Sequence, residues 1–172
     1  MTKLFALLLF ATVTTGYAQT TNVENKLKEL GITLMEPTKP MANYVKAVRT
    51  GNLIYLAGHG PSKADGTYIT GKVGKDLTVE QGAEAARQTG IALLSTLKAE
   101  IGDLNKVKRI VKVLGMVNCS EGFTEQPKVI NGFSDLMVQV FGEKGKHARS
   151  AVGMYALPQN IAVEIEMIVE VE

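Results

Sequence analysis

The sequence is poor in the residues that build disulfides, metal sites and nucleic-acid interfaces. Its 172 residues include one cysteine, two histidines and no tryptophan, and aromatic residues make up 6% of the chain. Because Cys119 stands alone, an intramolecular disulfide is excluded. The histidines are scattered and show no metal-ligand spacing. We therefore expect no metal, no cofactor, and a free thiol buried in the fold.

Charge of one sign is also lacking. The 19 Lys and Arg residues face 17 Asp and Glu, which gives a formal charge of +2, or +1 without Lys3. Nucleic-acid binding needs basic side chains clustered on one face, together with aromatic rings for base stacking. The composition therefore argues against a nucleic-acid partner.

A long apolar run occurs at the N-terminus. Lys3 precedes an apolar stretch from Leu4 to Val13, and small residues flank Tyr17 as far as Ala18. This pattern is typical of a secretory signal peptide, and the run is too short to span a bilayer. Residues 1–18 are thus predicted to be a signal peptide, with a buried N-terminal helix as the alternative. The mature protein is expected in the periplasm or outside the cell, without membrane attachment.

The remaining chain, about 154 residues, has the size of one domain. Residues 19–43 are expected to form a short helix and an extension. Thr21 and Glu24 fit a capping box there, and Gly31 supplies a C-terminal stop. Residues 44–172 are expected to form the main domain.

Hydrophobic periodicity predicts the elements of that domain. Strands are expected over residues 44–48, 53–57, 107–117, 148–157 and 161–171, with a short one near 67–70, and helices over 78–101 and 124–141. The order β-β-α-β-α-β-β predicts an α/β (α+β) fold in which two helices pack on one face of a mixed sheet. Thr78 and Gln81 form a cap for the longer helix. Small residues at 83, 86 and 90 would let this helix lie close to the sheet.

The closing strand alternates almost without interruption. Its odd positions from Ile161 to Val171 are apolar, whereas Glu164, Glu166 and Glu170 occupy even positions. Such a strand buries one face and turns the other to water or to a cleft between subunits.

Arg149 is the candidate anchor for a ligand. It shares its strand face with Ala151 and Gly153, and small neighbours leave a guanidinium room to bind a carboxylate through two hydrogen bonds. An arginine held by a nearby glutamate is an equally consistent alternative. A tight hairpin around residues 158–160 would put Glu164 opposite Met154, about 16 Å along the strand from Arg149. The two could then cooperate only through a long ligand or across subunits, unless another strand lies between them.

Six short motifs stand in a recognisable order. They are Tyr44-Val45-Lys46-Ala47, Leu56-Ala57-Gly58-His59-Gly60-Pro61, Val129-Ile130-Asn131, Ala148-Arg149-Ser150-Ala151-Val152, Leu157-Pro158 and Val163-Glu164-Ile165-Glu166. Together they resemble the Rid/YjgF family, the reactive-intermediate deaminases historically labelled endoribonuclease L-PSP. The resemblance spans roughly residues 44–171. Segments 71–74 and 145–149 are similar to a longer-chain subgroup with no well-defined substrate.

The resemblance implies a chorismate-mutase-like subunit in a homotrimer, with a ligand cleft at each subunit interface. It implies that Arg149 anchors the carboxylate of a 2-imino acid, and that Glu164 positions or activates the attacking water. The products would be a 2-oxo acid and ammonia. The residues implied to line the cleft are Tyr44, Gly58, His59, Asn131 and Ala151.

Two of these positions depart from the family pattern. Ala151 replaces a cysteine that the best-known deaminases often have, and imine hydrolysis does not require that thiol. His59 replaces a common glutamine and adds a group that titrates near neutral pH. A hydrogen-bonded structural histidine is the preferred interpretation of His59. His147 is interpreted as a surface or interface residue.

We therefore expect an exported protein that binds a small carboxylate ligand between subunits and hydrolyses 2-imino or enamino acids. An imine carbon is already electrophilic, so orientation, a polarised water and proton transfer suffice. A non-catalytic trimer that binds a small metabolite is the alternative. A ribonuclease is the weakest hypothesis, because the sequence has no paired histidines and no metal cluster.

Overall fold

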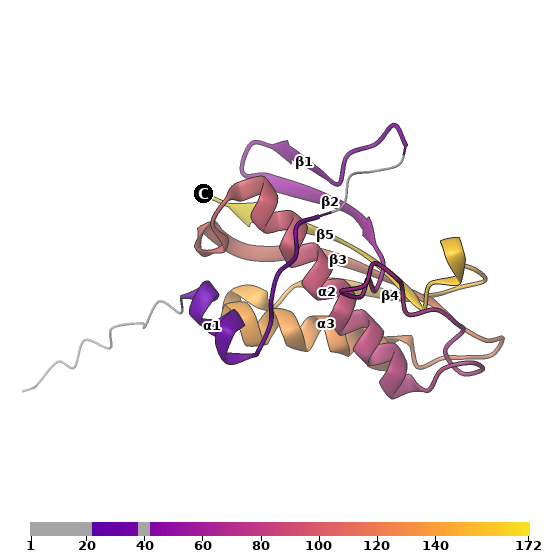
Figure 1. The fold of residues 1–172 in the computed structure, drawn as a ribbon. Helices are drawn as coiled ribbons and strands as arrows, with labels where there is room; N and C mark the ends of the chain where they lie inside the picture. The colour runs from indigo at the N-terminus through magenta and orange to yellow at the C-terminus, as the bar shows by residue number, and fades with distance from the viewer. Residues whose placement is uncertain (1–21, 38–41) are drawn as a thin grey trace, which may run out of the picture.

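A computed structural model describes residues 22–37 and 42–172 (Figure 1). The predicted signal peptide, residues 1–18, lies outside the described residues. The first helix, α1, spans Val23–Glu29 and is capped by Asn22, whose side chain accepts a hydrogen bond from the backbone of Asn25. An Asn side chain is a good acceptor at this position, and Thr21, the predicted capping residue, lies outside the described residues.

Five strands form one mixed sheet in the order β1-β2-β5-β3-β4. Their bounds are β1 Ala47–Thr50, β2 Leu53–His59, β3 Val107–Asn118, β4 Ala148–Met154 and β5 Val163–Val171. Strands β3 and β4 are parallel, whereas the other neighbours are antiparallel. The predicted order of elements and the mixed sheet are confirmed.

Several boundaries differ from the prediction. The first strand begins at Ala47 rather than Tyr44, and the second continues through Gly58 to His59. Residues 67–70 form only isolated bridges, from Tyr68 to Ser62 and from Thr70 to Ile161. Glycines around this loop interrupt any longer ladder.

Two long helices cover one side of the sheet (Figure 1). Helix α2 spans Val79–Ile101 and α3 spans Gln126–Phe141, with short 3-10 turns η1 Leu104–Lys106, η2 Gly142–Gly145 and η3 Pro158–Asn160. The predicted capping box of α2 is present in both directions between Thr78 and Gln81. Helix α3 is the crossover that the parallel pair β3–β4 requires.

The core lies between the helices and the sheet. All odd positions of β5 are buried, and Val163, Ile165 and Val169 are fully enclosed. The helices contribute a matching apolar stripe that includes Leu93, Leu97, Phe133, Leu136 and Met137. Burial of these side chains is the main favourable term in folding.

Helices α2 and α3 approach each other at small residues. A Cβ added to Gly132 of α3 would lie 1.9 Å from the carbonyl oxygen of Ala83 on α2. A Cβ at Gly90 of α2 would lie 2.9 Å from Leu136 of α3. Ala83 and Gly90 therefore allow close contact with the neighbouring helix, where the sequence had indicated contact with the sheet.

The other face of the sheet carries apolar side chains that no described helix covers. Val48, Tyr55 and Val152 are 51%, 44% and 39% exposed. Partners across neighbouring strands share a face, and Val48, Tyr55 and Ile168 form one such row.

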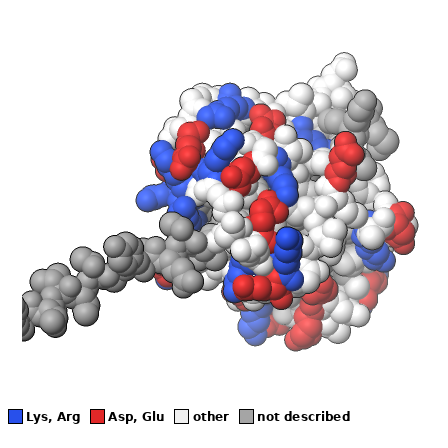
Figure 2. All heavy atoms as spheres, turned by 60° about the vertical axis from the view of Figure 1, so that its left-hand side comes forward, with Lys and Arg blue, Asp and Glu red and all other residues white. Residues whose placement is uncertain are grey.

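Within residues 22–37 and 42–172, no helix is both long and apolar enough to cross a bilayer. On the side viewed in Figure 2, charges of both signs mix, with Lys and Arg gathered toward the upper left.

Gly132→Ala is expected to lower the free energy of unfolding by about 1–3 kcal/mol or more, because the new methyl group must push the α3 backbone away from α2. Urea or thermal denaturation measures the loss. Asp135→Ala, an exposed position on the same helix, serves as the control and should change stability by less than about 0.5 kcal/mol. Equal stabilities of the two variants would contradict the close helix contact.

Candidate functional site

Arg149 lies on β4, the edge strand, and its guanidinium is held by α3. Its Nη1 donates to Asn131 Oδ1 at 3.0 Å and to Ser134 Oγ at 2.9 Å. Its Nη2 points to the carbonyl oxygen of Pro127 at 3.5 Å. These three residues occupy one face of the helix because they are separated by four and three positions. The guanidinium is thus fixed between α3 and the edge of the sheet.

No carboxylate neutralises Arg149 in the part of the chain that the structure describes. The ion pairs found there join other residues, and the acceptors around Arg149 are an amide, a hydroxyl and a carbonyl. Neutral acceptors orient a guanidinium without cancelling its charge. The alternative of an arginine held by a nearby glutamate is therefore not what the described residues show.

Glu164 lies on β5 beside Gly58 of β2. The two are so close that a Cβ at Gly58 would sit 2.1 Å from Glu164 Oε1. The half-buried side chain has a raised pKa, first because burial disfavours the carboxylate and second because Glu166 carries a like charge. Gly58 and Glu164 thus form a second small group of the predicted site residues.

The two groups lie on opposite faces of the sheet within one chain. Arg149 pairs with Val113 of β3, which pairs with Met167, and both partners are buried beneath the helices. Glu164 pairs instead with Met116. Odd and even β5 positions face opposite ways, so Glu164 faces away from the helices.

The hairpin distance of about 16 Å between Arg149 and Glu164 does not apply, because β3 lies between β4 and β5. Since β3 separates β4 from β5, Arg149 and Glu164 are two strands and three residues apart, a backbone separation on the order of 14 Å. With side chains that also diverge, the two groups do not meet around one small ligand inside a single chain.

The remaining predicted residues divide between these groups. Asn131 contacts Arg149 directly, and Ala151 lies two residues from Arg149 on the same face, opposite Gly115 of β3. Tyr44 precedes β1, at the opposite edge of the sheet, and is 55% exposed. The structure therefore brings together Arg149 with Asn131 and Ala151, but leaves Tyr44 apart from them.

His59 is enclosed under α2. Its Nδ1 lies 2.7 Å from the carbonyl oxygen of Ala57, and its Nε2 lies 2.8 Å from Thr96 Oγ1. Burial lowers its pKa, and the charge of Lys46 adds to the effect. The ring therefore points toward α2, away from the face that carries Glu164.

Sequence reasoning missed Ser134 as a partner of Arg149. Ser134 Oγ accepts from Arg149 and lies 3.1 Å from His147 Nε2, while His147 Nδ1 lies 2.7 Å from the carbonyl oxygen of Gly145. Burial lowers the pKa of His147, and the nearby charge of Arg149 lowers it further. The spacing of Ser134 three residues after Asn131 could have indicated a shared helix face.

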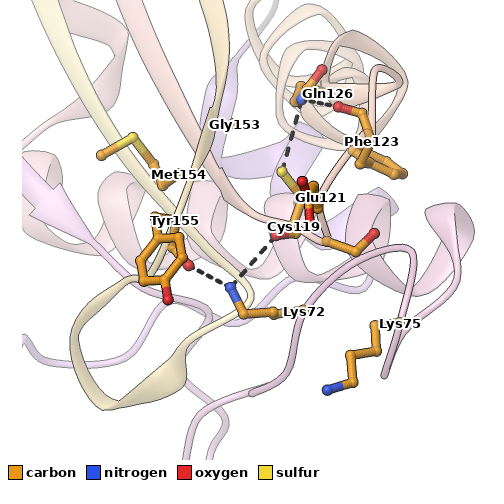
Figure 3. Close-up of a pocket in the computed structure, with 10 residues that line it drawn as sticks. Lys72, Lys75, Cys119, Glu121, Phe123, Gln126, Gly153, Met154 and Tyr155 are labelled. Carbon is orange, nitrogen blue, oxygen red and sulfur yellow. Dashed lines mark hydrogen bonds between the residues drawn. The ribbon is translucent and has the colours of Figure 1, made fainter.

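A cavity of about 700 Å³ opens at the ends of β3 and β4 (Figure 3). Gly153, four residues beyond Arg149 on its strand, lines it together with Cys119, Gln126 and Lys72. The predicted buried thiol is in fact half-buried, with Gln126 Nε2 at 3.8 Å from its sulfur. The Lys72 ammonium donates to the carbonyls of Cys119 and Tyr155. In the described ranges, no three His, Cys, Asp or Glu side chains gather as metal ligands.

Glu164→Gln is expected to raise the melting temperature near neutral pH. The pKa of Glu164 lies above its ordinary value of 4.5 in the folded chain, so the folded state binds that proton more tightly than the unfolded state. Stability therefore falls as pH rises from the ordinary value through the folded-state pKa. The gain from the substitution should be largest at about pH 7.5 and should shrink below about pH 4.5.

Calorimetry across this pH range tests the expectation, with Glu100→Gln, an exposed position at the end of α2, as the matched control. A Glu164→Gln curve that runs parallel to wild type at every pH would contradict the raised pKa.

Comparisons with known proteins agree with this architecture. Residues 24–171 match the YjgF/chorismate mutase-like family. Protein TCP17 of Trypanosoma cruzi is 44% identical over 149 residues, which are 86% of this chain and 93% of that protein. The crystal structure of Atu1372 from Agrobacterium tumefaciens, a protein of unknown function, has a TM-score of 0.82 and 43% identity, and the match covers 89% of this chain and 96% of that one.

A more distant relative carries an activity in its name. The 2-iminobutanoate/2-iminopropanoate deaminase of Dermatophagoides farinae is 29% identical over 135 residues, covering 78% of this chain and 90% of that protein. The matches span nearly all of the described fold, including both β4 and β5. The chain therefore belongs to the YjgF/chorismate mutase-like family.

Proposed function

We propose that this protein hydrolyses 2-imino or enamino acids to 2-oxo acids and ammonia, in sites that each combine two neighbouring copies of the chain. The observation that carries the proposal is the state of Arg149, which keeps its full charge while neutral acceptors on α3 fix its orientation. A guanidinium held in this way is a ready partner for a small carboxylate.

Glu164 supplies the second chemical requirement. Because burial and Glu166 raise its pKa, its carboxylate is a stronger base than an ordinary glutamate. In the proposed reaction it takes a proton from water as the water oxygen attacks the imine carbon. The proton then passes to the nitrogen, which gives a carbinolamine. Its hydroxyl group gives up its proton to the nitrogen, again through Glu164, as the C–N bond breaks, so that ammonia leaves and the carbonyl group forms.

A second copy is needed to unite the two groups. Within one chain Arg149 and Glu164 face opposite sides of the sheet, so a shared ligand requires Arg149 from one copy and Glu164 from the next. A head-to-tail contact gives a ring when the rotation between neighbouring copies closes on itself, and a homotrimer is the ring that the family resemblance implies. The exposed apolar side chains of Val48, Tyr55 and Val152 on the uncovered face of the sheet support burial of this face between subunits.

The deaminase name of the mite relative supports the reaction class. The proposal includes export, because residues 1–18 have the pattern of a signal peptide. In the periplasm or outside the cell, the substrate would be a small carboxylate or imine compound. Metabolite binding without turnover is the alternative that the kinetic experiment separates from catalysis.

Arg149→Ala is expected to lower kcat/KM for ammonia release by about 10- to 100-fold, the effect of losing hydrogen bonds to a charged group. The assay generates 2-imino acids in situ with an amino-acid oxidase and follows ammonia or 2-oxo acid formation. Arg87→Ala is the matched control, since Arg87 is on α2 and contacts Gln139. Equal rates for wild type and Arg149→Ala would remove the deaminase proposal.

Mixed assemblies of Arg149→Ala and Glu164→Gln chains are expected to be more active than assemblies of either variant alone. In a ring of three that contains both variants, about one boundary in three joins an intact Arg149 to an intact Glu164. Specific activity should therefore approach roughly a third of the wild-type value. Co-expression with two different tags and purification through both yields these assemblies.

Assemblies of Arg149→Ala chains with the double variant, which contain no Arg149, provide the negative control and should stay inactive. Mixed rings as inactive as their parents would show that the two residues do not cooperate across a subunit boundary.

A further inference from the structure

A second hollow, which the proposed reaction does not use, lies where β3 begins. Its volume is about 620 Å³, and residues 110, 111 and 148 form part of its wall. Its charged and titratable lining is Lys108, Arg109, Glu143, Lys144, Lys146 and His147. These side chains come from three segments: the start of β3, the turn η2, and the two residues before β4. We name it the β3-edge hollow.

Positive charge dominates this lining. Four lysine and arginine side chains face one glutamate, in a chain whose whole formal charge is +2. Figure 2, which brings the left side of Figure 1 forward, shows Lys and Arg mixed with Asp and Glu on that side, so the excess of positive charge is a property of this lining and not of the whole face. Clustering of this kind raises the local concentration of anions.

Part of this charge has no carboxylate partner among residues 22–37 and 42–172. Glu143 pairs with Lys146 at 2.8 Å, and Arg109 lies 3.7 Å from Glu170, with its own side chain 68% exposed. Lys144 donates to a neutral carbonyl, that of Val107, at 3.1 Å. Lys108 has no hydrogen-bond or ion-pair partner among the described residues. Lys108 and Lys144 therefore bring charge that no carboxylate cancels.

The backbone adds further donors. Strand β3 starts at Val107, but its pairing with β4 begins only at Lys112 and Ala148. Residues 108–111 therefore have an unpaired edge on this side, and an unpaired strand edge presents free N–H groups. Lysine ammonium groups around such an edge are a donor set that suits the oxygens of a tetrahedral anion.

We propose that the β3-edge hollow binds a small phosphate dianion, either inorganic phosphate or a phosphate monoester. Its volume lies within the range of small-molecule sites, about 300–1,000 Å³, and exceeds what a bare phosphate fills. The additional space would hold the organic part of a monoester. This proposal stands on the hollow and does not depend on the proposed hydrolysis.

The β3-edge hollow is connected to Arg149 through two side chains, His147 and Ser134. His147, part of its wall, lies 3.1 Å from Ser134 Oγ, and this hydroxyl accepts from Arg149. A dianion in the hollow would favour the protonated form of His147, and the imidazolium would then have to donate from Nε2 to Ser134. Two cationic donors would share one hydroxyl oxygen. The protonation of His147 should therefore change when an anion binds in the hollow.

The test follows both histidine imidazoles by proton NMR while inorganic phosphate is added at constant ionic strength, with chloride as the balancing anion. The His147 resonance is expected to shift with saturation. Its pKa should rise by about 0.5–1 unit, since an opposite charge nearby favours the imidazolium. His59 should not respond, because its ring is enclosed under α2 against Thr96.

Lys108→Ala and Lys144→Ala should each weaken phosphate binding by about 5- to 10-fold, and Lys108→Glu should abolish the His147 response. Lys63→Ala, an exposed lysine in another loop, is the matched control and should bind like wild type. Because the Lys108 side chain makes no hydrogen bond or ion pair with the described residues, its variants test binding without loss of such a bond. Phenyl phosphate tests the monoester.

Two outcomes would overturn the proposal. One is a His147 shift that never saturates or that is the same in Lys108→Ala and wild type. The other is an RNA oligonucleotide that binds through Lys108 at least 100-fold more tightly than phenyl phosphate with a steep salt dependence, which would identify a polynucleotide surface.

Discussion

The burial of one face of β5 is the constraint on which the site depends. This strand pairs on both sides, with β2 and with β3, and its odd residues fill the core. Because successive side chains of a strand point to opposite faces of the sheet, Glu164, at an even position, lies on the face away from the helices. Arg149 pairs with Val113 of β3, whose side chain is buried beneath the helices, and paired residues share a face. Arg149 therefore points toward the helices. The separation of the two side chains therefore follows from the sheet itself, and this is why the proposed site takes Arg149 and Glu164 from two copies of the chain.

Helix α3 both closes the core and holds the Arg149 side chain. Its buried stripe, with Phe133 and Leu136, closes the core, while its partly exposed face holds the guanidinium through Asn131 and Ser134. The small residue Gly132 lies between these two and allows α2 to approach. Core packing and the orientation of Arg149 are therefore set by adjacent residues, so a shift of this helix would disturb both.

Features encoded in neighbouring residues could be predicted from the sequence, whereas the pairing of distant segments could not. The alternation of β5 and the cap at Thr78 are encoded in neighbouring residues, so both could be predicted. Strand order depends on pairing between distant segments, so the sequence left open whether the last two strands form a hairpin or have another strand between them, and β3 lies between them. Ser134 was missed because a serine in a helix carries no signal until the residue that faces it is known. Arg149 and Glu164 were identifiable by family resemblance, whereas their opposite orientations were not.

The contact of Gly58 with Glu164 restricts how this sequence can change during evolution. The carboxylate of Glu164 occupies the volume that any other residue at position 58 would need, so a side chain there displaces this carboxylate from its place beside β2 unless position 164 is smaller or β2 shifts. The bulge that ends regular pairing between Leu56 and His59 is part of the same local geometry. Positions 58 and 164 should therefore covary among homologues, although 105 residues of chain lie between them.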